Sequence, residues 1–357
     1  MSKKLASKKP VSDRTRINLA LQGGGAHGAF TWGVLDRLLQ EEDIEIAAIS
    51  GTSAGAMNGA ALKAGMLAGG REGARENLAW LWQQMGAVED RRFSNWMTAL
   101  SPFPSMFSAF FEHSIPFQMA EAATNFISPY DYGPAYFNPL ERIAERFHYD
   151  LVCKDCEPHL FVSATNVRTG KLKVFSGASI TPQAILASAC LPTLFQAVEI
   201  EDPDTGTTEA YWDGGYIGNP ALFPLVDKDL PGDVVIVNIN PLHREELPRS
   251  AAEIQNRINE ISFNSSLLRE LRALTFTQQL VAAGLLQKNE MKDLHIHMIA
   301  DDELMNELSV ATKMIPNPAT LARLFDAGVA AAERFLSEDR GNLGKRDSVD
   351  LEAMFRG

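Results

Sequence analysis

Cysteine is scarce in this 357-residue sequence, which contains only Cys153, Cys156 and Cys190. So small and odd a number of cysteines suits a reducing compartment better than a disulfide framework. The sequence also lacks an apolar segment of the signal-peptide type near its start. Its two longest uncharged runs, 93–111 and 174–198, are each interrupted by two prolines, so neither is typical of a membrane span. We therefore expect a soluble, cytoplasmic protein.

Positive charge is also scarce, and the net charge is −12. An acidic protein of this kind has no electrostatic footprint for nucleic acid, so we expect no nucleic-acid partner. The exception is residues 1–16, which carry a net charge of +5. We interpret them as a flexible basic N-terminal arm. The alternative is contact with anionic lipid at the inner membrane face, worth about 1 kcal/mol per basic side chain.

Metal-binding patterns are limited to one weak match. Cys153, Cys156 and His159 are spaced as C-x-x-C-x-x-H, but no second pair of ligands follows them. A structural zinc site needs four ligands. We therefore expect no metal.

The remaining sequence has the composition of an ordinary globular protein, with 45% apolar and 22% charged residues. Its first half opens with a short apolar run at 17–21, a helical pattern at 29–40, a second apolar run at 44–49 and an Ala-rich helical pattern at 54–67. Strands alternating with helices predict an α/β fold with a mostly parallel central sheet and helices on both faces, giving three layers.

The pattern continues beyond residue 150. It predicts strands at 159–167, 171–177, 232–240 and 293–300, a buried helix at 185–195 that stops near Pro192, and helices at 250–287 and 319–336. We divide the chain into the arm at 1–16, a main domain at 17–230, a C-terminal part of the same α/β unit with a helical extension at 231–336, and a polar tail at 337–357. Residues 93–137 form an insert rich in aromatic side chains, and they are either a lid or part of the core.

The stretch "ISGTSAGA" contains the pattern G-x-S-x-G, made by Gly51, Ser53 and Gly55. It lies between a predicted strand and a predicted helix, which is the context of a nucleophile elbow. The two glycines let the chain turn sharply, and the helix N-terminus stabilises a developing anion. Ser53 is therefore the candidate nucleophile.

A serine nucleophile needs a base, and two kinds are available. The histidines after Ser53 lack an obvious catalytic context; they are His113, His148, His159, His243, His295 and His297. A Ser-His-Asp esterase with a distant histidine stays an alternative. The aspartate in "YWDGGY" is the better candidate, because Asp213 precedes Gly214 and Gly215 and such a turn lets a carboxylate project from a strand end.

The glycine-rich stretch "LQGGGAHGAF" admits two interpretations. Gly23, Gly25 and Gly28 match G-x-G-x-x-G, the fingerprint of NAD(P)- or flavin-binding oxidoreductases. That fingerprint also requires an acidic residue where the second strand ends, whereas the acidic residues here lie at 41–45, before that strand or at its start. We therefore favour backbone N–H groups that bind an oxyanion, and we keep the oxidoreductase as the alternative.

These three motifs in this order resemble the patatin-like phospholipase family, whose relatives include the neuropathy-target-esterase group. The block "ASACLPTLFQAV" at 187–198 also looks like part of that family, and "RINEISFNSSLLRELRAL" looks like the extension of a bacterial subgroup. The resemblance covers about 17–226 well. It implies a patatin-like catalytic domain over 17–230 and a bacterial member of the neuropathy-target-esterase-like group.

The resemblance also implies a mechanism and a set of site residues. Ser53 would be the nucleophile and Asp213 the proton acceptor of a dyad that forms an acyl-enzyme and needs no cofactor. The oxyanion hole would come from the loop formed by Gly23, Gly24, Gly25, Ala26, His27 and Gly28. Many relatives have Arg or Lys where His27 stands, which puts a role of this loop in binding anionic head groups in doubt.

The implied substrate is an ester of a phospholipid or lysophospholipid, met at a peripheral membrane surface. A homo-oligomer is left open. A non-catalytic lipid-binding protein that kept the fold is a further alternative.

Overall fold

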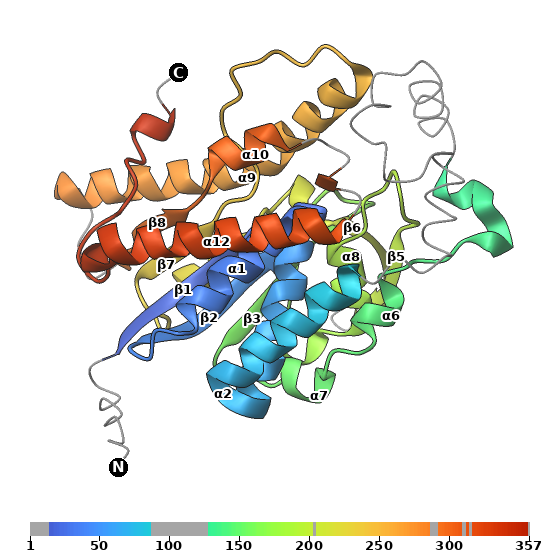
Figure 1. Ribbon diagram of the computed structural model, residues 1–357, viewed down its shortest axis with the longest axis horizontal. Coiled ribbons are helices and arrows are strands. Elements are labelled where there is room, and N and C mark those ends of the chain that lie inside the picture. Colours follow the sequence, from blue (N-terminus) through green and yellow to red (C-terminus); the bar gives the residue numbers. More distant parts are fainter. Residues whose placement is uncertain are drawn as a thin grey trace.

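The computed structural model describes residues 14–86, 128–202, 205–285, 292–308, 312–313 and 316–355. A single mixed sheet runs through this part of the chain, in the order β5-β6-β3-β2-β1-β7-β8, with β4 paired to β3 (Figure 1). Five central strands are parallel: β1 (Thr15–Leu21), β2 (Ile44–Thr52), β3 (His159–Asn166), β7 (Asp233–Val237) and β8 (His295–Ile299). The antiparallel partners at one edge are β4 (Leu172–Ser176), β6 (Thr207–Asp213) and β5 (Val198–Asp202).

Helices connect and cover these strands. The α-helices are α1 (Gly28–Leu38), α2 (Ala54–Gly86), α6 (Glu141–Ala144), α7 (Tyr149–Val152), α8 (Pro182–Ser188), α9 (Ala251–Ala282), α10 (Asp302–Glu307) and α12 (Pro318–Glu338). Single 3-10 turns lie at η2 (Gly25–His27), η4 (Pro129–Ala135), η5 (Gly177–Ser179), η6 (Gly214–Tyr216), η7 (Phe223–Val226), η8 (Arg340–Asn342) and η9 (Ala353–Phe355).

The sheet is buried on both faces, which gives the expected three layers. Helices α1, α2 and α12 cover one face, where their apolar side chains pack on Ile17, Leu19 and Leu21 of β1 (Figure 1). Helix α9 covers the other face, where Leu267 and Leu271 pack with strand residues of opposite parity. Strands buried on both faces read as continuous apolar runs, which is why the sequence revealed them.

Helix α2 doubles back on itself and so brings its C-terminal half to the carboxyl edge of the sheet. Gly69 and Gly70 have non-helical backbone angles, and Gly70 has a φ of 65° that favours glycine. After this break the Asn77 side chain donates to the Ala61 carbonyl at 2.7 Å. Trp82 then donates from Nε1 to Asn58 Oδ1 at 2.9 Å, close to the start of the helix.

The predicted elements correspond to observed ones, but the helix expected at 54–67 runs on to Gly86 as α2, and β5, β6, α6, α7 and α10 have no predicted counterpart. The helix expected at 185–195 is α8, which begins at Pro182 because Thr181 caps it and ends at Ser188, before Pro192. The chain turns there, and Ser188 and Cys190 accept hydrogen bonds from the backbone N–H groups of Ser53 and Asp213. Most of the aromatic insert at 93–137 lies outside the described residues. Its described end is held in place by Tyr130 and Tyr136, whose hydroxyls accept from the backbone N–H groups of Ala197 and Gln196.

Candidate active site

Ser53 lies at the junction of β2 and α2, at the carboxyl edge of the sheet. Its φ of 53° is in the left-handed region, and no other described residue except glycine has a positive φ. This is the sharp turn that a nucleophile elbow requires. The side chain is 7% exposed, and its carbonyl accepts the first helical hydrogen bond, from the N–H of Met57.

Asp213 ends β6 and is buried beside this turn. Its Oδ1 accepts a hydrogen bond from the Gly215 N–H at 2.7 Å, while Oδ2 is buried without a partner of normal geometry in the described part of the chain. Burial raises the pKa of this carboxyl to about 7, against the lowering effect of the Gly215 N–H and the Ser53 hydroxyl. A carboxyl with a pKa near neutrality is suited to accept and return a proton.

Tight backbone packing explains why the motifs are rich in glycine. A Cβ added at Gly23 would lie 2.7 Å from Ser53 Cβ, and one at Gly55 would lie 2.1 Å from the Leu21 carbonyl oxygen. The same holds for the other motif glycines, for which the nearest atom would lie between 2.3 and 2.9 Å away: Gly24, Gly25, Gly28, Gly51, Gly214 and Gly215. The structure thus brings all three sequence motifs together around Ser53.

The glycine loop offers backbone donors next to Ser53, but they are not equivalent. The Gly23 N–H already donates to Asn219 Oδ1 at 2.6 Å. Within the described residues, the N–H groups of Gly24 and Gly25 donate to no acceptor. Both N–H groups are therefore free to donate to an oxygen atom bound at the loop.

The His27 side chain does not contribute to anion binding. Its ring is completely buried, and its Nε2 lies 2.8 Å from Thr312 Oγ1. Burial, and then the positive charge of Lys313, lower its pKa to about 3, so the ring is neutral at physiological pH. His27 thus anchors the loop to the 312–313 segment and contributes no positive charge.

The block at 187–198, which resembles part of the family, binds the backbones of both Ser53 and Asp213. The Ser53 N–H donates to Ser188 Oγ at 2.9 Å, and the Asp213 N–H donates to the Cys190 carbonyl at 2.7 Å. Both acceptor residues lie in the block "ASACLP": Ser188 is the last residue of α8, and Cys190 follows two residues later. The resemblance of this block to the family indicates that the block matters. It does not indicate which residues the block contacts, because those residues lie far away in the sequence.

We expect Ser188→Ala to lower kcat for ester cleavage about ten-fold with little change in KM. The substitution leaves the buried Ser53 N–H without its acceptor, which costs about 1–3 kcal/mol and loosens the left-handed turn. Ser188→Cys, which keeps a weak acceptor, should recover part of the rate. Steady-state kinetics and urea unfolding of both variants measure this, and wild-type kcat in Ser188→Ala would show that the contact has no role in catalysis.

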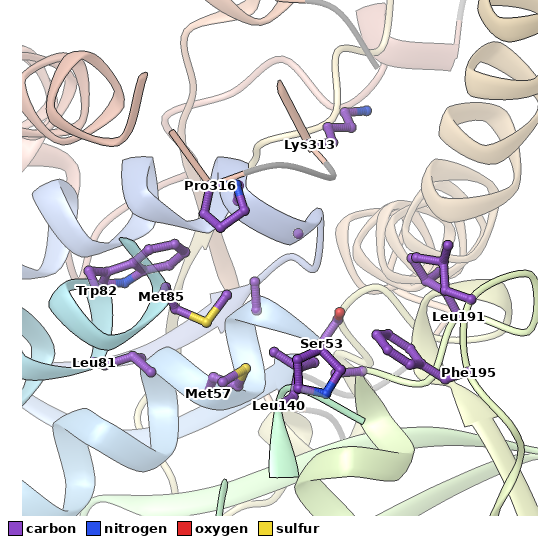
Figure 2. A pocket seen from close by; sticks show the side chains of 16 residues that line it. Ser53, Met57, Leu81, Trp82, Met85, Leu140, Leu191, Phe195, Lys313 and Pro316 are labelled. Carbon is purple, nitrogen blue, oxygen red and sulfur yellow. The ribbon is translucent and has the colours of Figure 1, made fainter. Parts of the chain in front are cut away.

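An apolar pocket opens over Ser53, with an empty volume of about 870 Å³ including its mouth. Figure 2 shows Leu81, Trp82 and Met85 on one side of Ser53, and Leu191 and Phe195 on the other. Among its 16 lining residues only Ser53 and Lys313 carry a hydroxyl or a charge. Such a pocket fits an acyl chain better than a polar substrate.

His297 and His159, two of the alternative candidates, lie away from Ser53, and His113 lies outside the described residues. His297 is fully buried, with Nε2 2.9 Å from Asp233 Oδ1 and Nδ1 2.7 Å from Ser348 Oγ. Asp233 begins β7, His297 lies in the middle of β8 and Ser348 lies in the C-terminal tail, whereas Ser53 follows the carboxyl end of β2. His159 lies 3.5 Å from Asp155, and no described group of three His, Cys, Asp or Glu side chains is arranged to hold a metal ion.

We expect His297→Ala to lower the free energy of unfolding by about 2–4 kcal/mol, because it leaves Asp233 and Ser348 without their shared partner. Hydrolytic kcat should not change. His295→Ala on the same strand is the matched control, because its side chain is only partly buried. Urea unfolding and kinetics of both variants provide the measurement. A folded His297→Ala protein without activity would favour a Ser-His-Asp mechanism.

A mostly parallel sheet that ends in a serine elbow beside an apolar pocket is the arrangement of an α/β lipid acyl hydrolase. Residues 19–226, more than half of the chain, match the model of the family described as patatin-like phospholipase, and the chain belongs to that family. A comparison with curated protein sequences finds no match. The expected neuropathy-target-esterase-like subgroup stays a prediction.

Solved structures of two bacterial proteins are similar to most of this chain. VipD from Legionella pneumophila aligns with a TM-score of 0.41 at 14% identity, over 91% of this chain and 67% of VipD. The type III effector ExoU of Pseudomonas aeruginosa aligns with a TM-score of 0.33 at 13% identity, over 91% of this chain and 53% of ExoU. The chain thus spans about two thirds of the first and about half of the second.

In the part of the chain that the structure describes, no helix combines the length and the apolar character needed to cross a bilayer.

Proposed function

We propose that the protein hydrolyses carboxylic esters of phospholipids or lysophospholipids through a dyad of Ser53 and Asp213. The observation that carries this proposal is the buried Asp213 carboxyl, with its pKa raised to about 7, beside a serine held at φ 53° under an apolar pocket. Membership of the patatin-like phospholipase family supports lipid esters as the substrate class. Without Asp213 the same turn would lack a base.

The reaction proceeds in two halves. Ser53 Oγ attacks the ester carbonyl carbon while its proton passes to Asp213, and the carbonyl oxygen becomes an anion facing the loop N–H groups. The bond to the leaving alcohol then breaks, and Asp213 returns the proton to the departing oxygen. Water attacks the acyl-enzyme and gives a proton to Asp213, which passes to Ser53 Oγ as the fatty acid leaves.

The pocket supports an acyl chain, and the surroundings support a membrane as the source of substrate. The apolar lining on either side of Ser53 has room for a chain but few polar groups to bind a sugar or peptide. Exposed isoleucines follow one stripe of α9 at Ile254, Ile258 and Ile261. We propose that substrate is taken from the membrane surface. Residues 1–13 of the expected basic arm lie outside the described residues, whereas Thr15 and Arg16 already belong to β1, so the arm is shorter than expected.

A lipid-panel assay tests the proposal. Vesicles of a diacyl phospholipid, micelles of the matching lysophospholipid and an emulsion of the matching triglyceride are each incubated with wild-type protein and with Ser53→Ala. We expect fatty-acid release from one or both phospholipids by the wild type alone. Release from none of the three lipids would contradict the proposed substrate class, and equal release by both proteins would contradict the proposed nucleophile.

A further inference from the structure

The peptide group between Gly23 and Gly24 is held by side chains from behind the glycine loop. The Gly23 carbonyl accepts from Asn240 Nδ2 at 2.8 Å and from Asn219 Nδ2 at 3.3 Å. In a trans peptide the carbonyl and the next N–H point in opposite directions. Holding the Gly23 carbonyl therefore also fixes the direction of the Gly24 N–H, which the described residues leave without an acceptor.

The orientation of the Asn240 amide follows from its neighbours. Gln22 Oε1 accepts from the N–H groups of Ile239 and Asn240, so the Asn240 group facing it must be the donor Nδ2. On the other side the Lys313 ammonium, which can only donate, lies 3.5 Å from Asn240 Oδ1. Both neighbours turn the Asn240 NH₂ group toward the loop.

Lys313 is itself held in place by a buried cluster. Its Nζ donates to Glu260 Oε1 at 2.9 Å, and Arg244 binds the same carboxylate with two bonds of 2.8 Å. The Lys313 carbonyl packs on the loop, because a Cβ added at Gly25 would lie 2.3 Å from it. Figure 2 shows the Lys313 side chain directed away from Ser53. Its charge therefore contacts Asn240 and Glu260, which lie behind the glycine loop.

We propose that Asn240 is a positioning residue that locks the Gly23–Gly24 peptide with the Gly24 N–H facing the oxyanion of the reacting ester. The inference rests on the proposed function of Ser53. It extends the site beyond the family match at 19–226, because Asn240, Glu260 and Lys313 all lie outside that range. Asn240 is 1% exposed and bonded on both amide ends, so the lock is rigid.

Three variants separate a role of Asn240 in positioning the Gly23–Gly24 peptide from a role in the stability of the fold. Asn240→Ala removes the donor to the Gly23 carbonyl. Asn240→Asp keeps the shape and gains an ion pair with Lys313, but it puts a carboxylate oxygen against that carbonyl. The matched control is Asn18→Ala, since Asn18 is also fully buried and donates from Nδ2 to a backbone carbonyl, that of Pro231, at 2.7 Å.

The readout is the preference for an oxoester over its thionoester, measured with p-nitrophenyl butyrate and O-p-nitrophenyl thionobutyrate. Sulfur accepts hydrogen bonds poorly. The ratio of kcat/KM for the oxoester to kcat/KM for the thionoester therefore reports whether N–H donors face the oxyanion. We expect Asn240→Ala and Asn240→Asp to lower oxoester kcat at least about ten-fold and to reduce the ratio about five-fold or more. Asn18→Ala should keep the wild-type ratio, and Lys313→Met should show a smaller reduction.

The outcomes distinguish this inference from the proposed function. Urea unfolding first establishes which variants are folded, and Lys313→Met provides the test if both Asn240 variants are not. A folded Asn240 variant with the wild-type ratio overturns the positioning role, as does full activity of Asn240→Asp. If the wild type cleaves neither ester and no lipid, it is the proposed function that fails.

Discussion

Asp213→Asn should lower kcat for lipid ester hydrolysis by about 10³-fold, because it removes the group that takes the proton from Ser53. The substitution is nearly isosteric, and the side-chain oxygen can keep the hydrogen bond from the Gly215 N–H. In the wild type, kcat/KM should rise with pH through an apparent pKa near 7, the value to which burial raises the Asp213 carboxyl. The variant should lose this rise. Stopped-flow or steady-state hydrolysis over a range of pH values measures both effects.

Asp213→Asn should lose activity but gain stability above neutral pH. The folded pKa of Asp213 is about 7 and its ordinary value is 3.8, so between these values the folded protein holds a proton that the unfolded chain has lost. Wild-type stability therefore falls as pH rises through this range, and asparagine removes the fall. Above neutral pH, Asp213→Asn should be more stable by up to about 4 kcal/mol. Equal unfolding free energies at low and high pH in both proteins would contradict a buried, raised carboxyl.

Ser53→Ala should reduce hydrolysis to the background rate, a loss of about 10⁶-fold in kcat. No other described hydroxyl both lines the pocket and lies at a turn with positive φ. Alanine should also cost little stability, because the hydrogen bonds that hold the turn are made by the backbone N–H and carbonyl of Ser53, which the substitution retains. Lipid binding to vesicles should be unchanged, which separates loss of chemistry from loss of substrate.

The control for this variant is Ser163→Ala. Ser163 is a buried serine on β3 whose hydroxyl has no partner in the described part of the chain. It should retain wild-type activity and similar stability. Substantial hydrolysis by Ser53→Ala, equal to that of Ser163→Ala, would place the nucleophile elsewhere.

The parallel central strands and the serine elbow could be predicted because their signals are local, whereas β5 and β6, which are partly exposed, have no continuous apolar run. Strands buried on both faces leave continuous apolar runs, and the elbow leaves two glycines around a serine. The close approach of Gly23 to Ser53 likewise follows once the two motifs lie on adjacent strands, β1 and β2. The preference for an oxyanion loop over a dinucleotide site also rests on a local pattern, since β2 ends at Thr52 without an acidic residue.

The support of the site could not be predicted, because it depends on contacts between residues far apart in the sequence. Asn240 lies 217 residues from Gly23, and Ser188 lies 135 residues from Ser53. Buried asparagines and serines have no periodicity that marks them. The role of His27 could not be predicted from the sequence either. Its burial and its contact with Thr312 show that it anchors the loop.

The most direct test of the account is capture of the acyl-enzyme. Wild-type protein is mixed with a lysophospholipid, quenched in acid within one turnover and digested, and the peptides are weighed by mass spectrometry. The account predicts a fatty acyl group on the peptide that contains Ser53, and its accumulation in a variant slowed at the second half of the reaction. An acyl group on any other residue, or turnover with no acylated peptide at any time, would contradict it.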